Sequence, residues 1–255
     1  MHVVAQVSDL HFNGTAENRK RAEAVMDYLN GRCGGPRNID ALLVTGDIAD
    51  EGLPTEYREA LDTLVTDIPT VMLLGNHDDR AAFTEVTAGT GRTDPVNSAL
   101  RVPASDAGSG LLVLALDSSI PGRSDGYLSR PTLDWARSQI ADAGPDTDVL
   151  VAFHHPAIDI GIGFIDGMRQ LDPRLLADFV AEHPGIVGCV SGHAHTAAVT
   201  SFAGRPHAVA PGVASTLNLP FEGSAVINSS HRPGVAFHLI DDAHRLTTHF
   251  RGVPG

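Results

Sequence analysis

The sequence predicts an α/β fold in which short strands alternate with helices. Six apolar runs rich in branched residues each end in polar residues, as buried strands that lead into loops do; they are 2–9, 39–47, 70–78, 110–119, 148–156 and 185–193. Helical spacing of apolar residues separates several of these runs, which favours a largely parallel sheet. The 255 residues suit one domain, so residues 1–255 are predicted to form a single one.

Apolar residues three and four positions apart predict the helices between these strands. The first is expected over 22–29. The second begins near Pro54, since proline suits a first helical turn, and its apolar face covers 57–64. Further helices are expected over 133–140 and 175–180.

The pattern changes after His195. Short strand-like pieces follow without a convincing helix between them, at 198–202, 207–210, 234–240 and 245–250. They predict a second sheet that is mixed or antiparallel. The segments 156–170 and 217–234 are rich in Gly, Pro, Asn and Ser, so we expect loops that border a functional site.

The composition narrows the classes of partner. A formal net charge of -13 disfavours binding to nucleic-acid polymers and to anionic membranes. No apolar run reaches the roughly 18 residues of a membrane span, so no membrane association is expected. Cys33 and Cys189 are the two cysteines, and the apolar stretch 3–7 is too short for the core of a signal peptide. We therefore expect a cytoplasmic protein, and a homo-oligomer is left open.

Five of the strand-like runs end in side chains that can bind metals. These candidate ligands are Asp9, His11, Asp47, Asn76, His154, His193 and His195. The carboxyl ends of parallel strands meet at one edge of a sheet, so residues distant in sequence are expected to converge there. A single Asp or His at a strand end is more often a cap or turn residue, but this explanation would have to apply independently at five strand ends.

The spacing and chemistry of these residues predict two metal ions. In an extended segment, Asp9 and His11, like His193 and His195, would share one face, so each pair could chelate an ion. Carboxylate, imidazole and amide donors suit Mn²⁺, Fe²⁺ or Fe³⁺, with Zn²⁺ as an alternative. Seven ligands are too many for one ion, whereas two ions that share Asp47 would use them all.

These motifs resemble those of the calcineurin-like metallophosphoesterases. That family's blocks occur in order as Asp9-Leu10-His11, Gly46-Asp47, Gly75-Asn76-His77-Asp78, His154 and Gly192-His193-Ala194-His195. Within the family the chain looks most like bacterial class III cyclic-nucleotide phosphodiesterases, through SDLHF, GDIAD, GNHDDR, LDSSIPG, FHHP and GHAH. The resemblance extends from Met1 to about residue 241.

The resemblance implies a four-layer α/β/β/α sandwich of two mixed sheets flanked by helices. It also implies that one ion is held by Asp9, His11, Asp47 and His195 and the other by Asp47, Asn76, His154 and His193. Relatives often have a second proline where this chain has Ala157, which leaves the shape of the following loop open.

Two catalytic residues follow from the same resemblance. His77 adjoins Asn76, and the family places this histidine over the phosphate, where it can stabilise an oxygen or protonate the leaving group. Asp50 matches the acid that orients this histidine in relatives. Alternatively, Asp50 caps the helix near Pro54.

Other polar residues near the motifs receive simpler interpretations. In an extended strand His155 would point away from His154, so we expect it in the core or supporting a ligand. Residues 78–80 are expected at the start of a helix, where acids are favoured. Asp117 and Ser118 end another strand and are expected to support the site.

The function predicted is hydrolysis of a phosphate ester. A hydroxide that bridges two metals attacks phosphorus, because coordination lowers the pKa of water from near 15.7 toward about 7. The ions also let an acidic protein accept an anionic substrate. The expected partner is a small-molecule phosphate ester, with a cyclic nucleotide as the first choice. The alternatives are a glycerophosphodiester, a nucleotide or sugar-nucleotide pyrophosphate, a phosphomonoester, and, remotely, a non-catalytic binding scaffold.

Overall fold

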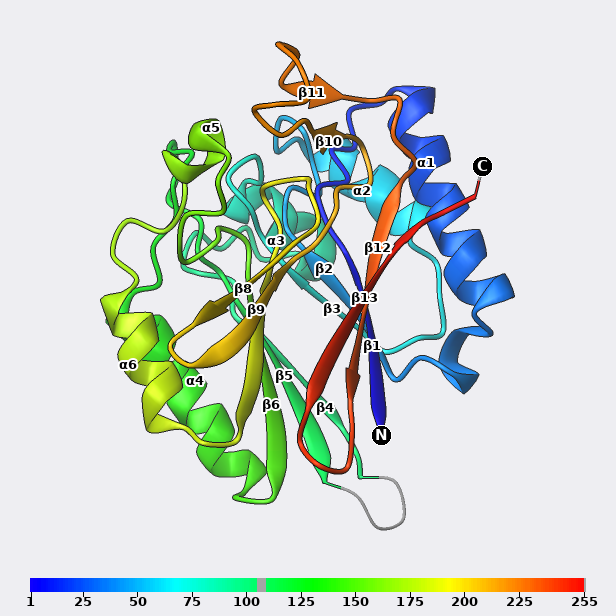
Figure 1. The fold of residues 1–255 in the computed structure, drawn as a ribbon. Helices are drawn as coiled ribbons and strands as arrows, with labels where there is room; N and C mark the ends of the chain where they lie inside the picture. The colour runs from blue at the N-terminus through cyan, green and yellow to red at the C-terminus, as the bar shows by residue number, and fades with distance from the viewer. Residues whose placement is uncertain (105–108, 255) are drawn as a thin grey trace.

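The computed structural model describes residues 1–104 and 109–254, which form two mixed β-sheets packed face to face (Figure 1). The first sheet has the strand order β13-β12-β1-β2-β3. Its strands are β1 (His2–Val7), β2 (Ala41–Thr45), β3 (Thr70–Leu73), β12 (Gly234–Ile240) and β13 (Leu246–Gly252). Strands β1 to β3 run parallel, whereas β12 and β13 add in antiparallel fashion beside β1.

The second sheet has the order β4-β5-β6-β7-β9-β8. Its strands are β4 (Ser98–Val102), β5 (Gly110–Leu116), β6 (Thr147–Phe153), β7 (Ile186–Ser191), β8 (Ala198–Phe202) and β9 (Arg205–Val209). The four central strands are parallel, and the edge strands β4 and β8 are antiparallel to their neighbours. A separate two-stranded ribbon joins β10 (Thr216–Leu217) to β11 (Ile227–Asn228).

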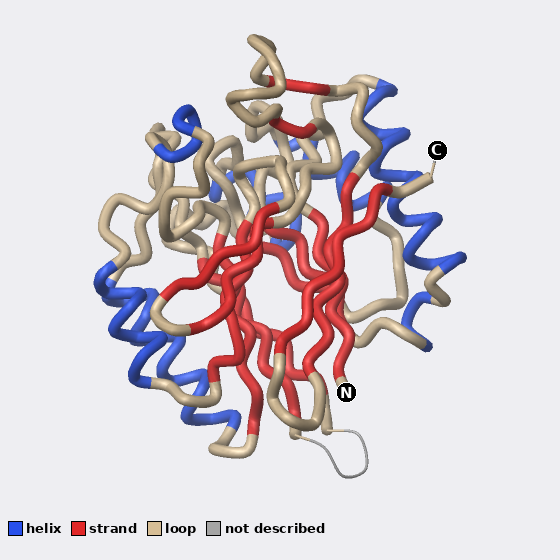
Figure 2. Tube along the Cα trace, viewed as in Figure 1, coloured by secondary structure: helices blue, strands red, loops and turns tan. Residues whose placement is uncertain are grey.

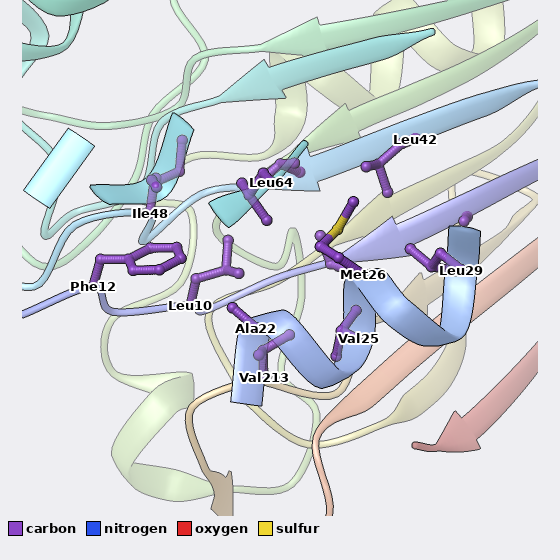
Figure 3. Close-up of a cluster of buried hydrophobic side chains, with 14 of the residues drawn as sticks. Leu10, Phe12, Ala22, Val25, Met26, Leu29, Leu42, Ile48, Leu64 and Val213 are labelled. Atoms are coloured by element: carbon purple, nitrogen blue, oxygen red, sulfur yellow. The ribbon is translucent and has the colours of Figure 1, made fainter. Parts of the chain in front are cut away.

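Helices cover the outer face of each sheet. Helices α1 (Ala16–Asp27), α2 (Pro54–Thr63) and α3 (Arg80–Ala88) pack on the first sheet, and α4 (Arg130–Ala143) and α6 (Arg174–Glu182) pack on the second. Figure 3 shows the first of these cores, where Val25 and Met26 of α1 lie near Leu42. Short helical turns follow α1 at Tyr28–Arg32 and Gly35–Arg37.

Alternation of side chains along the strands separates the layers. In β2, Leu42 and Val44 face the helices, while Leu43 faces the second sheet. In the same way Leu112 faces α4 and α6, and Val113 faces the first sheet. The four-layer α/β/β/α sandwich of two mixed sheets flanked by helices is therefore confirmed.

The expected separate sheet after His195 is wrong. Strands β8 and β9 extend the second sheet, whereas β12 and β13 return to the first, where β12 pairs with β1. Alternating apolar and polar residues indicate that one face of a strand is buried. They do not indicate which strand pairs with its edge, because that depends on the tertiary structure.

Several short elements were not predicted. Strand β4 lies between the third and fourth apolar runs, and α5 (Gly163–Asp166) and β10–β11 lie in or beside the segments expected to be loops. Of helix α3, only a start at 78–80 was expected. Figure 2 shows that the long loops gather at one end of the sandwich, at the carboxyl ends of the parallel strands. Within residues 1–104 and 109–254, no helix is long and apolar enough to cross a membrane.

Candidate metal centre

The predicted ligands come together at the loop end of the sandwich. Asp9 and His11 follow β1, Asp47 follows β2, and Asn76 follows β3 in the first sheet. His154 follows β6, and His193 and His195 follow β7 in the second sheet. Both sheets thus contribute to one site, which lies where their parallel strands end.

One group of potential ligand atoms comprises Asp9, His11, Asp47 and His195. The Nε2 atoms of His11 and His195 are 3.2 Å apart, and Nε2 of His195 is 3.5 Å from a carboxylate oxygen of Asp9. Donors bound about 2.1 Å from one ion lie roughly 3 to 3.5 Å apart. The spacing in this group therefore matches a shared cation.

A second group of potential ligand atoms comprises His154, His155 and His193. Nε2 of His154 lies 3.2 Å from Nδ1 of His193 and 3.3 Å from a carboxylate oxygen of Asp47. The same oxygen of Asp47 is 3.7 Å from Nε2 of His11. Asp47 thus touches both groups. His193 and His195 fall in different groups, so the expectation from spacing alone that this pair chelates one ion is wrong.

The backbone at these residues is not extended, contrary to the reason given for the two i, i+2 pairs. Five of the seven predicted ligands have positive φ: Asp9 55°, His11 46°, Asp47 47°, His193 70° and His195 53°. Such left-handed conformations cost non-glycine residues free energy, and they persist where surrounding structure fixes them, commonly at functional sites. Tight left-handed turns, rather than pleated strands, direct these side chains into the site.

Two glycines allow the backbone to approach the ligands. A Cβ atom on Gly75 would lie 2.6 Å from the backbone nitrogen of Asp47 and 2.7 Å from Nε2 of His154. A Cβ atom on Gly46, whose φ is +87°, would lie 2.5 Å from Nδ1 of His154. Both positions exclude any larger side chain because it would occupy the space of the candidate ligands.

Three of the histidines have a hydrogen-bond partner for the ring nitrogen that faces away from the groups. Nδ1 of His11 lies 2.9 Å from a carboxylate oxygen of Asp50, and Nδ1 of His154 lies 2.7 Å from the carbonyl oxygen of Thr45. Nδ1 of His195 lies 3.0 Å from Oγ of Ser215. Such contacts fix the ring and its tautomer in metal-binding histidines.

The sequence did not point to Ser215 or to the carbonyl group of Thr45. Ser215 lies outside every motif, 20 residues beyond its partner His195. Thr45 precedes Asp47 by two residues, but its contribution is a backbone atom, which no side-chain pattern reports.

The residues present fit two metal ions. The carboxylate of Asp50 and the carbonyl oxygen of Thr45 accept hydrogen bonds from Nδ1 of His11 and His154, so in the neutral rings Nε2 would offer its lone pair to a metal ion. Among the described residues, Oδ2 of Asp9, Oδ1 of Asn76 and Nε2 of His193 are buried without a hydrogen-bond partner. Buried acceptors that face one another without a proton are unfavourable unless a cation lies between them.

The protonation equilibria reflect the same electrostatics. Burial disfavours charge on His11, but its hydrogen bond to Asp50 and the nearby carboxylates raise its pKa to about 9. His154 is likewise buried, and Asp47 raises its pKa to about 9. Burial, together with His154, lowers the pKa of His193 to about 3. The protonated rings of His11 and His154 therefore balance the negative charge of Asp47. A metal ion that binds there has to displace these protons.

His77 lies beside the first group of potential ligand atoms. Its ring meets that of His11 edge-on, with 4.6 Å between centroids, and its backbone N–H donates to Asp47 over 2.9 Å. Nδ1 of His77 is 2.8 Å from the carbonyl oxygen of Asp50. Asp50 thus contacts both histidines, through its carboxylate to His11 and through its carbonyl to His77.

Asp50 does not cap the following helix. Leu53 is the N-terminal capping residue of α2, and the side chain of Glu56 accepts hydrogen bonds from the backbone of Glu51 and Leu53. The capping alternative for Asp50 is therefore wrong, and its carboxylate is directed to the site.

The acidic residues after His77 have different tasks. Asp79 caps α3 by accepting a hydrogen bond from the backbone of Ala82, and Arg80 is the first residue of that helix, as expected. Asp78 does not belong to the helix start. Its carboxylate instead accepts backbone hydrogen bonds from Ile48, Ala49 and Gly75, and so joins the Asp47 turn to the Asn76 turn.

Ser118 supports the second group, of which His155 is a member. Oγ of Ser118 contacts Nδ1 of His155 over 2.9 Å and also accepts from the backbone of His154 over 3.3 Å, so it supports the site as expected. Contrary to expectation, the ring of His155 does not leave the cluster; its centroid is 4.7 Å from that of His193. Asp117 does not contact these residues but binds Arg80 over 2.8 Å.

A cavity of about 510 Å³ opens above the metal-ligand groups. Its floor includes His11, Asp47, Asn76 and His77. Its walls come from the start of α1, the loop before α4, the α5 region and the β10–β11 ribbon with its flanking residues. They comprise Glu17, Asn18, Ser124, Phe164, Ile165, Met168, Ala214, Ser215, Leu217, Ile227 and Ser229. No lysine or arginine of the described residues lines it. The segments 156–170 and 217–234 thus border the site, as predicted.

Comparison with known proteins places this geometry in a family. Residues 2–197 match the model of the calcineurin-like phosphoesterases. The chain is 32% identical over 231 residues to a probable cyclic nucleotide phosphodiesterase of Rhodococcus erythropolis, and the alignment covers 87% of this chain and 74% of that protein. It is also 32% identical over 212 residues to a glycerophosphodiester phosphodiesterase of Enterobacter lignolyticus, and that alignment covers 78% of this chain and 73% of that protein.

The fold has solved counterparts as well. A dimetal phosphatase from Danio rerio superposes with a TM-score of 0.67 at 13% identity and covers 99% of this chain and 96% of that one. This similarity concerns the fold alone. The family match over most of the chain and the buried His/Asp groups together lead to one conclusion. The chain belongs to the calcineurin-like phosphoesterase family and is a metal-dependent phosphoesterase.

Proposed function

We propose that the protein hydrolyses phosphodiesters with two metal ions, one held by Asp9, His11, Asp47 and His195 and the other by Asp47, Asn76, His154 and His193. The position of Asp47 carries this proposal, since one carboxylate oxygen lies 3.7 Å from Nε2 of His11 and 3.3 Å from Nε2 of His154. Ions bound there would polarise the phosphate oxygens and make water a stronger nucleophile. The imidazole-rich donor set favours manganese or iron, with zinc as the alternative.

His77 has the geometry of a group that acts on the phosphate or on the leaving alcohol. A carbonyl oxygen only accepts hydrogen bonds, so Nδ1 of His77 carries a hydrogen and donates it to the backbone carbonyl oxygen of Asp50 in a hydrogen bond. Nε2 then carries a proton only when the ring is an imidazolium. In that form His77 can donate to a phosphate oxygen or protonate the leaving group, and its 42% exposed side chain borders the cavity.

The charge of the cavity favours a diester over the other phosphate compounds. A diester carries one negative charge, whereas monoesters and pyrophosphates carry more. The described walls offer Glu17 but no lysine or arginine to receive a second anionic group. Since unpaired like charges reject a ligand, this lining disfavours nucleotide pyrophosphates and phosphomonoesters.

A cyclic nucleotide is our first choice of substrate, and a glycerophosphodiester is the second. Relatives bearing each of these names are about equally similar to this chain, at 32% identity. The cavity of about 510 Å³ lies within the roughly 300 to 1,000 Å³ usual for small-molecule sites. Its partly apolar wall suits a nucleoside better than a glycerol group, because glycerol has little apolar surface to bury.

A substrate panel with defined metals tests the proposal. Protein stripped by a chelator and reloaded with Mn²⁺, Mg²⁺ or no metal is assayed on 3′,5′- and 2′,3′-cyclic nucleotides, a glycerophosphodiester, ADP-ribose and a nucleoside monophosphate. We expect turnover of diesters that requires metal and is restored better by Mn²⁺ than by Mg²⁺. Full activity without metal, or turnover of no ester at all, would refute the proposal, and the latter would favour a binding scaffold.

Asp47→Asn provides the matched variant for the shared ligand. It keeps the size of the side chain and an oxygen that can accept the backbone N–H of His77. We expect metal content to fall at both sites, as measured by elemental analysis. Two tightly bound ions in this variant would contradict the sharing of Asp47.

We extend the proposal to action in the cytoplasm. Cys33 and Cys189 are both free thiols, which suits a reducing compartment. Fractionation of cells that express the full chain would test this, and recovery of the chain outside the cytoplasmic fraction would contradict it.

A further inference from the structure

Two segments with exposed apolar side chains flank the mouth of the cavity. Phe164 of α5 is 60% exposed, and Ile227 of β11 is 67% exposed. Both line the same cavity as His77. Figure 1 shows α5 and the β10–β11 ribbon at the loop end of the sandwich, on separate parts of the rim.

The bases of these two segments pack together beneath the mouth. Ile165 of α5 and Leu217 of β10 are 3% and 5% exposed and belong to one apolar cluster, against which Met168 packs. Phe164 precedes Ile165 in α5, and Ile227 pairs with Leu217 in the ribbon, so the two exposed side chains line the cavity beside this cluster. Large apolar side chains that face a functional cavity while in contact with water usually become covered when the ligand binds.

The β10–β11 wall is held in place by Arg21 on α1. We call residues 213–231 the arm. Nε of Arg21 donates to the carbonyl oxygen of Val213 over 2.7 Å, and its two terminal nitrogens donate to Ser229 and His231 over 3.2 and 2.7 Å. One guanidinium group thus joins both ends of the arm to a helix. A wall that is already formed binds its ligand at a smaller entropic cost.

Building on the phosphodiesterase function proposed above, we infer that Phe164 and Ile227 determine specificity by binding a flat apolar part of the diester. This part belongs to one of the two alcohol groups that the phosphate joins, and it lies against the apolar side of the cavity. The lining supports an uncharged occupant, because its described residues include Glu17 but neither lysine nor arginine. A second copy of this chain is the competing occupant of the exposed side chains.

Two synthetic diesters that differ only in the second alcohol test this inference. Phenyl p-nitrophenyl phosphate and methyl p-nitrophenyl phosphate have the same charge and release the same p-nitrophenolate. We expect the metal-loaded protein to prefer the phenyl ester. Phe164→Ser and Ile227→Ser should each lower the phenyl-to-methyl ratio of kcat/KM by roughly tenfold, the usual effect of removing apolar contact from a pocket. Phe164→Leu, which keeps apolar area, should retain part of the preference.

Two exposed residues outside the cavity provide matched controls. Phe221 of the arm is 83% exposed and Leu171 is 53% exposed, and neither lines the cavity. Phe221→Ser and Leu171→Ser should leave the phenyl-to-methyl ratio unchanged. Inhibition of methyl p-nitrophenyl phosphate hydrolysis by diphenyl phosphate, compared with dimethyl phosphate, gives a second readout and should weaken only in the Phe164 and Ile227 variants.

The outcomes separate this inference from the proposed function. Equal losses on both esters, or equal changes in the control variants, would overturn the specificity role while leaving phosphodiesterase activity intact. A dimer of the parent protein that dissociates in the Phe164 and Ile227 variants, as measured by light scattering, would show that a second copy covers these side chains instead. No turnover of either ester would refute the proposed function itself.

Discussion

The carboxylate of Asp50 lies 2.9 Å from Nδ1 of His11, on the side of the ring opposite to the candidate metal-binding nitrogen. This contact holds the ring so that Nε2 faces His195 and Asp47. The two residues are 39 positions apart in the sequence. Because they follow adjacent parallel strands β1 and β2, the sheet brings them together.

Loss of the Asp50 carboxylate should weaken metal binding at the His11 site. Replacing such a partner of a metal-binding histidine typically costs 10- to 100-fold in affinity or activity, so we expect a loss of about this size in Asp50→Ala. Asp50→Asn keeps an accepting oxygen and should lose less. Competition with a chromophoric chelator measures the affinity, and Asp62→Ala on the exposed face of α2 is the control. Unchanged affinity and turnover in Asp50→Ala would contradict this role.

Gly75→Ala should disrupt the metal centre more than the fold. The added methyl group would lie 2.6 Å from the backbone nitrogen of Asp47 and 2.7 Å from Nε2 of His154, so one of these groups must move. Overpacking of this kind costs about 1 to 3 kcal/mol in the free energy of unfolding. We expect a folded variant by circular dichroism with reduced metal content. Gly31→Ala is the control, because no atom lies within 4 Å of its added Cβ and its φ is not positive.

His77→Ala should retain both metals and lose roughly 10²- to 10⁴-fold in kcat, the usual contribution of a positioned acid or base. If His77 protonates the leaving alcohol, the loss should be larger for an alkyl diester than for an aryl diester that releases p-nitrophenolate. If it stabilises a phosphate oxygen, the two losses should be similar. Metal loss, or unchanged rates on both diesters, would show that the role assigned to His77 is wrong.

A buried histidine that is not among the candidate ligands should make the fold sensitive to acid. Burial lowers the pKa of His207 from 6.5 to about 4. Below pH 6.5 the histidine is protonated in the unfolded chain but stays neutral in the folded chain. The free energy of unfolding that is present above pH 6.5 is therefore lost as the pH falls toward 4. Between pH 7 and 5 this residue should cost about 2 kcal/mol.

Urea unfolding of the metal-free protein at pH 7 and pH 5 measures this effect. His207→Gln removes the titrating group and should lose less stability between these pH values than the parent, whatever its stability at pH 7. His249→Gln is the control, since this histidine is exposed on β13. An identical loss in the parent and in His207→Gln would contradict the prediction.

The sequence by itself determined six of the parallel strands, four of the helices and the candidate ligands. Apolar runs such as 39–47 have to be buried on both faces, and they end in polar residues that a buried strand cannot accommodate. The motifs, in the order of a known family, also indicated that Asp47 is shared. These signals are local or are carried by motifs of a few residues, so they can be read without knowing how the chain folds.

The tertiary structure alone decided which distant groups meet. The spacing of His193 and His195 suggested one ion for the pair, but positive φ values of 70° and 53° turn them into different groups. Ser215 contacts His195 through a loop without a motif, and Arg21 fixes the arm through backbone carbonyl oxygens. Left-handed turns, backbone acceptors and the choice of edge strands depend on contacts between residues far apart in the sequence, which no local pattern encodes.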